Sequence, residues 1–370
     1  MTNKKFNRRS WLEVNLTTLK SNYLIYKKRL NNTDYICAVV KADSYGLGSI
    51  EVSRTLQSAG CRFFAVSNID EAVLLRKNNI KGEIIILGYT DLNYLKDLKK
   101  YDITQAVLSE SYLEDIIRKK VKIKCQMAID TGMNRIGLDA ENISDTERII
   151  RKANKYLCLN GLFTHLCVAD TKGKEATEFT KKQIKSFLSV KESVKDLNLP
   201  YCHYLNSAGS TYYFKNSASD LYRLGIVLYG LKPDYTNKLP RGVKPIFKWK
   251  SVISMIKEVK TGETIGYGRT YKADKNIKVA TISTGYADGY NRALSNKGYV
   301  IIKGKKAKIL GRICMDQFMV DVTGIKCRPY DEVELINDSY NADDMAKDLN
   351  TIGYEVACNI SKRVNRIYVK

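Results

Sequence analysis

The sequence has little that would indicate a metal centre, a disulfide framework or a membrane span. Its nine cysteines form no CxxC pair and no metal-ligand spacing, and there are only two histidines. Scattered cysteines in an odd number are typical of reduced thiols in the cytoplasm. No apolar run approaches the roughly 20 residues that cross a bilayer, and no apolar core follows the basic start MTNKKFNRRS. We therefore expect a cytoplasmic protein with no metal, no signal peptide and no membrane segment.

Acidic residues are also few beside the basic ones. The chain has 62 Lys and Arg against 39 Asp and Glu, a net charge of +23. Such a charge permits binding to nucleic acid or to an anionic membrane surface. The lysines, however, are spread as pairs such as Lys99-Lys100, and no stretch matches a nucleic-acid-binding signature. A solvated basic surface is the favoured interpretation, with a nucleic-acid or membrane-surface binder as the alternative.

Strand-like apolar runs alternate with helical patterns over the first two thirds of the chain. Helical examples are SESYLEDIIRKK, with Ser109 as N-cap, and the apolar spacing of residues 178–197. Eight such runs alternating with helices over about 200 residues are typical of a (β/α)₈ barrel. The runs are residues 36–41, 63–66, 84–87, 104–108, 123–129, 157–164, 201–205 and 221–224.

The pattern changes near residue 240, at PRGVKPIFKW. The chain beyond this segment is rich in strand-like runs, and only NADDMAKDLN looks helical. We therefore predict an α/β protein with a TIM-type barrel over residues 17–240 and a mostly-β domain over residues 241–370. Residues 1–16 contain one alternating strand, WLEVNL, which we expect to pair with the C-terminal domain.

Several groups that carry chemistry fall where the predicted barrel strands end, which is where such barrels hold their active sites. Lys41 ends the first strand, Arg135 follows the fifth, and His165 ends the sixth. An amine at that edge can form a Schiff base with an aldehyde cofactor, although a solvated strand-end lysine is the simpler alternative. His203 lies inside the seventh strand, where a structural role is expected.

The segments after the seventh and eighth strands suggest a phosphate site. Asn206 and Ser207 begin a small-residue turn, and Ser207 offers a hydroxyl. Gly225 and Ile226 offer backbone N–H groups to an anion. Together with Lys41 across the barrel, these groups indicate pyridoxal 5′-phosphate.

Arg223 refines that hypothesis. An arginine cannot give up its proton, so at the pyridine nitrogen of the cofactor it would donate a hydrogen bond and leave that nitrogen neutral. The substrate carbanion is then less delocalised, which favours proton exchange over side reactions. Arg223 also argues against the alternative of a barrel-type pyridoxal decarboxylase of basic amino acids.

The chain resembles the alanine racemase family in motifs that succeed one another over nearly its whole length. The resemblance implies a homodimeric, pyridoxal-phosphate-dependent isomerase (EC 5.1.1.1) that interconverts L- and D-alanine by a two-base mechanism and supplies D-alanine for peptidoglycan. It also implies active sites completed by the partner subunit. The motifs are VVKADSYGLGS, DTGMNRIGL, the strand ending at His165, LNSAGS, YRLGIVLYG, IGYGRTY, STGYADGYNRALSN and GRICMDQFMVDVT.

The resemblance assigns roles residue by residue. Lys41 matches the Schiff-base lysine and one base, and Tyr267 matches the opposing base from the other subunit. His165 matches the partner that a tyrosine base needs, because tyrosine is weakly basic at neutral pH. Tyr45 and Ser207 match phosphate contacts.

Further roles concern the substrate. Arg135 and the backbone N–H of Met315 match contacts to its carboxylate. Tyr286 and Asp316 match residues near the entrance of the site.

Two positions depart from the family. Ala128 stands where many members have a carbamylated lysine that orients the arginine matching Arg135. Lys362 stands where a tyrosine usually contacts phosphate and narrows the pocket, and a flexible lysine walls off less space than a ring. The second departure leaves a serine racemase, or one of broader specificity, as an alternative to alanine.

Overall fold

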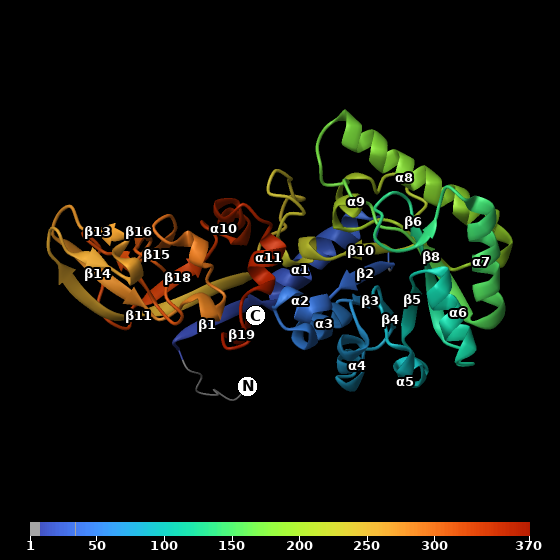
Figure 1. The fold of residues 1–370 in the computed structure, drawn as a ribbon, viewed down its shortest axis with the longest axis horizontal. Helices are drawn as coiled ribbons and strands as arrows, with labels where there is room; N and C mark the ends of the chain where they lie inside the picture. Colours follow the sequence, from blue (N-terminus) through green and yellow to red (C-terminus); the bar gives the residue numbers. More distant parts are fainter. Residues whose placement is uncertain (1–7, 34) are drawn as a thin grey trace. The chain divides into compact units, whose positions relative to one another are not determined.

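The computed structural model describes residues 8–33 and 35–370, and the chain divides into two compact units (Figure 1). The barrel unit comprises residues 19–44 and 49–243. The C-terminal unit comprises the described residues up to Thr18, residues 45–48 and residues 244–370.

Eight parallel strands form the barrel, and each overlaps one of the eight predicted runs, although β4 begins one residue before its run and β6 ends one residue after its run. Every neighbouring pair is parallel, and β10 pairs with β2. A bridge joins Leu205, two residues after β9, to Tyr222 of β10, so the barrel is nearly closed and the predicted fold is confirmed. In sheet order the strands are β10 (Tyr222–Leu224), β2 (Ile36–Val39), β3 (Phe63–Val66), β4 (Glu83–Ile86), β5 (Thr104–Val107), β6 (Lys124–Asp130), β8 (Cys158–Phe163) and β9 (Tyr201–His203).

Helices cover the outside of these strands (Figure 1). In α6, Tyr112, Leu113 and Ile116 are buried on one face, and the Ser109 hydroxyl accepts the Tyr112 N–H at 3.2 Å. This is the N-cap that the sequence predicts. The helices are α1 (Leu16–Arg29), α3 (Ser49–Ser58), α4 (Ile69–Lys77), α5 (Leu95–Lys100), α6 (Glu110–Arg118), α7 (Ile143–Tyr156) and α8 (Lys174–Ser193).

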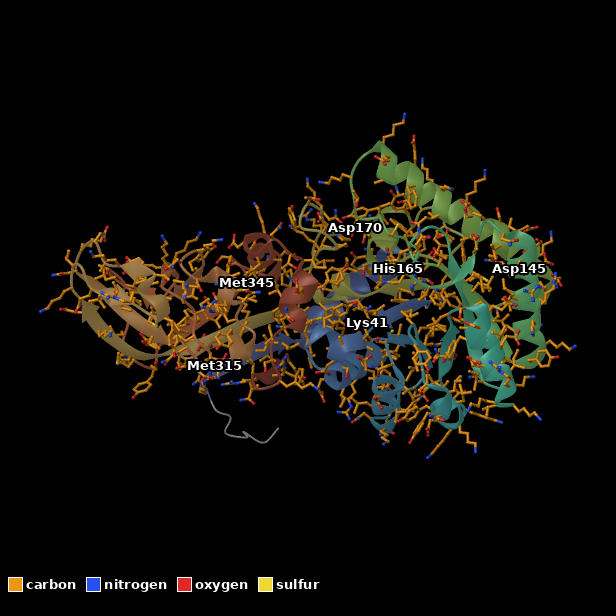
Figure 2. The ribbon with its side chains drawn as sticks, viewed as in Figure 1. Lys41, Asp145, His165, Asp170, Met315 and Met345 are labelled. Atoms are coloured by element: carbon orange, nitrogen blue, oxygen red, sulfur yellow. The ribbon has the colours of Figure 1, made fainter. Side chains whose placement is uncertain are left out.

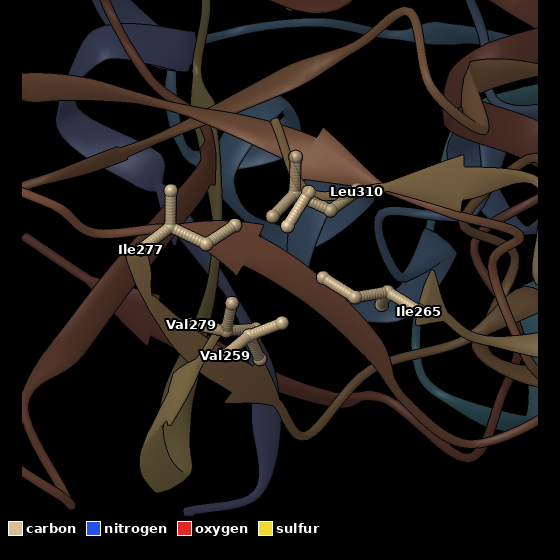
Figure 3. Packing of buried hydrophobic residues seen from close by; sticks show 6 residues of the cluster. Val259, Ile265, Ile277, Val279 and Leu310 are labelled. Atoms are coloured by element: carbon tan, nitrogen blue, oxygen red, sulfur yellow. The ribbon is translucent and has the colours of Figure 1, made fainter. Parts of the chain in front are cut away.

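The C-terminal unit is built on an eight-stranded sheet. β1 lies between β11, to which it is antiparallel, and β19, to which it is parallel. A further pairing of β14 with β11 closes part of the sheet on itself, around an apolar core that includes Val259, Ile277 and Leu310 (Figure 3). In sheet order the strands are β14 (Ile277–Ile282), β17 (Phe318–Asp321), β16 (Lys305–Leu310), β15 (Tyr299–Ile302), β18 (Glu332–Ile336), β11 (Phe247–Val259), β1 (Ser10–Asn15) and β19 (Asn365–Val369).

The C-terminal unit has more helix than the sequence predicts. The expected helix is present as α10 (Ala342–Leu349), but α11 (Gly353–Cys358) packs beside it. A helix of 6 residues is too short for an apolar period to be visible, and its packing against α10 stabilises it instead. No helix within the described ranges combines the length and apolar character needed to cross a bilayer.

Candidate active site

A cavity of about 380 Å³ lies at the carboxyl ends of the barrel strands. It brings together Lys41, Arg135, His165 and Arg223, four side chains that the sequence places at separate strand ends. Figure 2 shows Lys41 and His165 within the barrel unit. A volume of this size suits a small cofactor with its substrate, and three of the four groups are cationic.

The backbone directly after Lys41 has an unusual conformation. Residues 42–45 are all non-glycine, yet their φ angles are 52°, 54°, 54° and 56°. Left-handed backbone costs an L-residue about 1–2 kcal/mol, and such strain persists where surrounding contacts over-determine it. The turn is therefore held by tertiary contacts.

Side chains on both sides supply those contacts. The Glu71 carboxylate accepts the Ala42 N–H and the Ser67 N–H, both at 2.8 Å. The Asp43 carboxylate accepts the Ser49 N–H at 2.7 Å. Glu71 thereby ties the residue after Lys41 to the end of β3.

The turn ends at Tyr45, which belongs to the C-terminal unit. Its ring meets that of Tyr354 edge-on with centroids 5.8 Å apart, and burial raises the pKa of its hydroxyl. Gly48 has φ +97°, and a Cβ there would lie 1.8 Å from the Tyr368 hydroxyl. The glycine is thus required by both backbone and space.

Arg223 is almost fully buried at the end of β10. It donates hydrogen bonds to the Thr164 carbonyl at 2.7 Å and to Nδ1 of His203. Because an arginine can only donate, Nδ1 of His203 accepts, and Nε2–H donates to the Gln126 side chain at 2.9 Å. Burial lowers the pKa of Arg223 to about 10, so the guanidinium stays charged at neutral pH. His203 and Gln126 thus orient Arg223.

His165 is held as a neutral imidazole. Its Nε2 faces the Asn206 amide at 3.4 Å. Burial, and after it the positive charges of three neighbours, lowers the pKa of His165 to about 3. Those neighbours are Arg223, Arg135 and Lys41.

Gln183 of α8 is a supporting residue that sequence reasoning missed. Its buried side chain accepts the Cys167 N–H at 3.1 Å and donates to the Thr131 hydroxyl and the His165 carbonyl, each at 3.2 Å. It therefore joins the ends of β6 and β8 behind His165. The only available sequence signal is a glutamine on the apolar face of a helix.

Three of the predicted phosphate donors, Ser207, Gly225 and Ile226, lie next to one another. The Ser207 hydroxyl accepts the Gly225 N–H at 2.9 Å, and Ile226 opens a 3₁₀ helix whose first N–H groups have no partner within the turn. Asn206 caps the short helix that begins at Ser207 by accepting the Gly209 N–H at 2.9 Å.

Arg135 follows a tightly bonded turn. The Asp130 carboxylate accepts the backbone N–H groups of residues 132–134 at 2.9 to 3.1 Å. Ala128 lies in the wall of the same cavity as Arg135, and its methyl group cannot carry a carbamate.

The remaining predicted residues belong to the C-terminal unit. Tyr267 is 70% exposed and Met315 53% exposed, and Tyr286 and Lys362 are also exposed. Asp316 forms an ion pair with Arg363 at 2.7 Å. Within the described chain, none of them lines the barrel cavity.

Known sequences resemble this chain over almost its full length. The family models described as alanine racemase N-terminal and C-terminal domain match residues 14–233 and 246–368. An alanine racemase of Clostridium novyi is 39% identical, with 97% of this chain and 95% of the relative covered. Alanine racemase 1 of Bacillus subtilis is 36% identical, with 100% of this chain and 95% of the relative covered.

Solved structures resemble it equally well. An alanine racemase of Clostridium difficile superimposes with a TM-score of 0.91 at 35% identity, covering 99% of this chain and 97% of that one. The alanine racemase of Bacillus anthracis with bound L-Ala-P superimposes with a TM-score of 0.91 at 30% identity, covering 99% of this chain and 96% of that one.

Proposed function

The chain belongs to the alanine racemase family, and on that premise we propose that it interconverts L-alanine and D-alanine with pyridoxal 5′-phosphate in the barrel cavity. The observation that carries the proposal is the convergence of Lys41, Arg223 and a neutral His165 on one cavity. When bound, the cofactor supplies an aldehyde for the amino group and withdraws electrons from the substrate Cα.

The donors at and after the carboxyl ends of β9 and β10 fit such a cofactor, although among these described residues only Arg223 lines the cavity itself. The Ser207 hydroxyl and the Ile226 N–H would donate to the phosphate, while the Gly225 N–H, which the Ser207 oxygen accepts, would orient that hydroxyl. Asn206 fixes the turn from which Ser207 projects. Arg223, charged and immobilised by the Thr164 carbonyl and His203, would donate to the ring nitrogen. Tyr45 would add a phosphate contact from the end of the left-handed turn.

Inversion at Cα requires two bases on opposite faces. Lys41 would take or return the proton on one face, and Tyr267 of the partner subunit on the other. The 70% exposure of Tyr267 supports its availability to a second chain, and hence a homodimer with shared sites. Neutral His165 offers the tyrosine hydroxyl a partner.

The remaining residues would orient the substrate. Arg135 and the Met315 N–H would bind its carboxylate, with Tyr286 and Asp316 near the entrance. The D-alanine formed would serve peptidoglycan. We place the protein in the cytoplasm, supported by its nine free cysteine thiols.

The test is racemisation by the purified protein loaded with pyridoxal phosphate. D-alanine should form from L-alanine, and L-alanine from D-alanine, as measured by chiral chromatography. Lys41→Ala should abolish both reactions. A wild-type protein that binds the cofactor but leaves alanine unchanged would contradict the proposal.

Lys362 supports one alternative substrate. If Lys362 occupies the place of the family tyrosine at the assembled site, its flexible and exposed side chain would enclose the pocket less than a ring and would admit serine. Turnover of serine and alanine by the wild type and by Lys362→Tyr decides between them. The serine alternative requires substantial wild-type turnover of serine, which Lys362→Tyr should reduce.

A further inference from the structure

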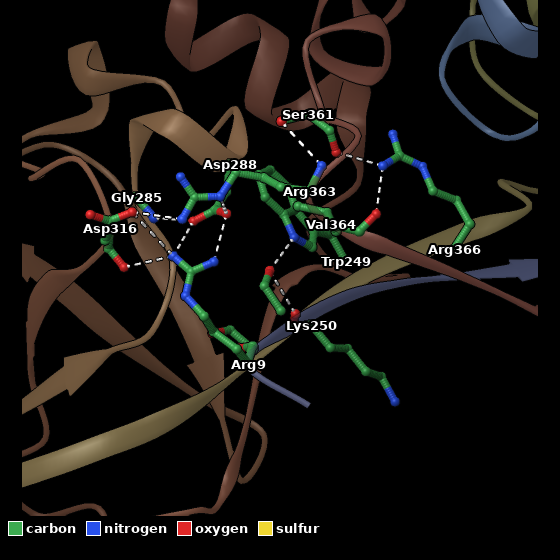
Figure 4. A network of polar contacts seen from close by, with 12 residues as sticks. Arg9, Trp249, Lys250, Gly285, Asp288, Asp316, Ser361, Arg363, Val364 and Arg366 are labelled. Carbon is green, nitrogen blue, oxygen red and sulfur yellow. Dashed lines mark hydrogen bonds and ion pairs between the residues drawn. The ribbon is translucent and has the colours of Figure 1, made fainter. Parts of the chain in front are cut away.

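A fully buried carboxylate lies at the centre of an ionic network in the C-terminal unit (Figure 4). Both Asp288 oxygens accept hydrogen bonds from Arg9, each at 2.7 Å. Arg363 approaches the same carboxylate at 3.1 Å, and the Gly285 N–H donates to it at 2.9 Å. A buried carboxylate is stable only when paired and hydrogen-bonded in this way.

The same two arginines also hold Asp316, the residue after Met315. Arg9 donates to the Asp316 backbone carbonyl at 3.0 Å, and Arg363 donates to its carboxylate at 2.7 Å. Two positive and two negative charges therefore balance one another. The network links Arg9, the residue before β1, to the segment that carries Met315.

The peptide between Cys314 and Met315 is fixed from a second direction. The Cys314 carbonyl accepts the Tyr286 N–H, and the Met315 carbonyl accepts the Ala287 N–H, both at 3.0 Å. A Cβ on Gly285 would lie 2.4 Å and 2.3 Å from these two carbonyl oxygens, so only glycine allows the approach.

These contacts determine where the Met315 N–H points. A trans peptide is planar, so its N–H is directed opposite to its C=O. With the Cys314 carbonyl bound to the Tyr286 N–H, the Met315 N–H faces away from the turn that holds it. Among the described residues this N–H has no acceptor, and Met315 is 53% exposed.

We propose that Asp288, through Arg9 and Arg363, is a positioning residue that aims the Met315 N–H at the substrate carboxylate. The inference rests on the proposed function, because it takes the ligand to be an amino-acid carboxylate. Asp288 accepts the Gly285 N–H and so closes the turn whose N–H groups bind the carbonyls of Met315 and of the residue before it. The same carboxylate holds Arg9 and Arg363, which anchor the residue after Met315. Loss of the network frees the N–H without touching the barrel cavity.

Arg9→Gln tests the inference, with Arg8→Gln as the matched control. Arg8 is the neighbouring residue, with its side chain 70% exposed, a 3.9 Å ion pair to Glu332 and its guanidinium 5.3 Å from the centre of the Trp11 ring. Within the described chain, no hydrogen bond or ion pair joins Arg8 to Asp288 or Asp316. Arg9→Gln should raise the KM for alanine and the Ki of propionate about tenfold, as expected for a lost hydrogen bond to a charged group. The cofactor dissociation constant should stay unchanged, and Arg8→Gln should resemble the wild type in every measurement.

Two further variants keep the test decisive. Arg363→Lys should reproduce the rise in KM and Ki to a smaller degree, because it keeps one charged donor. A folded Asp288→Asn variant should raise KM and Ki as much as Arg9→Gln does. If Arg9→Gln matches Arg8→Gln in KM and Ki, or only lowers the unfolding temperature, the positioning role is wrong. A wild type that does not racemise alanine would instead contradict the proposed function.

Discussion

At the scale of single residues, both histidines of the chain sit where a positive charge is disfavoured. Burial and nearby cations lower the pKa of His165 to about 3. Burial and Arg223 lower the pKa of His203 well below its usual range. In the unfolded chain both titrate near pH 6.5, so between that pH and about 3 the unfolded state binds protons that the folded state does not.

Stability should therefore fall as the pH drops below about 6.5, by up to about 1.4 kcal/mol per pH unit for each histidine. Above that pH the histidines contribute no pH dependence. Urea unfolding of the cofactor-free protein between pH 7.5 and 5.5 measures this, in a range where few carboxylates titrate. His203→Gln should reduce the slope by about half, and an unchanged slope would contradict the assignment.

Single residues also show which parts of the site the sequence could predict. Lys41, His165 and Arg223 lie at the ends of apolar runs, so a barrel places them at one edge, and the cavity does contain them. Tyr267 is one of 25 tyrosines, and only the family resemblance selects it. Gln183 could not be predicted, because its role depends on contacts between distant segments.

At the scale of elements, the left-handed turn after Lys41 depends on the first turn of α4. Glu71→Gln leaves one acceptor oxygen for two N–H groups and sets an amide N–H₂ against the other. The turn should loosen, raising the dissociation constant for pyridoxal phosphate about tenfold and lowering stability by about 1–3 kcal/mol. Absorbance titration and thermal unfolding measure these effects.

Asp70→Asn is the matched control. Asp70 is the other acidic residue in the first turn of α4, so its loss has a similar effect on helix electrostatics. It should leave cofactor affinity unchanged. Equal effects of the two substitutions would show that Glu71 acts only through the helix.

Elements differ in how far the sequence determines them. The barrel strands are buried apolar runs bounded by turns, and those signals are local. The turn of residues 42–45 gave no such signal, because four L-residues adopt left-handed φ angles only under tertiary contacts such as those of Glu71. α11 was missed for a related reason, since packing against α10 stabilises it.

At the scale of the whole molecule, the proposed sharing of active sites between two subunits makes a prediction about mixed dimers. Lys41→Ala and Tyr267→Phe should each be inactive alone. In a mixed dimer one site carries both substitutions and the other carries neither. With equal subunits assorting at random, half the dimers are mixed and each has one intact site of two, so about a quarter of wild-type activity should return.

The matched control pairs Lys41→Ala with a chain carrying both substitutions. That mixture has no site with both bases, so it should stay inactive. Alanine racemisation after refolding the tagged chains together measures both mixtures. Activity no greater than the sum of the separate variants would contradict the shared site.

The position of β1 has a consequence for synthesis on the ribosome. β1 lies between β11 and β19, strands that are made only after the whole barrel unit. At about 5–20 residues per second, β1 waits roughly 12–50 seconds before β11 emerges. During that wait its apolar face is exposed and its backbone edge unpaired, a state that favours aggregation. Nascent chains should therefore depend on chaperones until the last strand emerges.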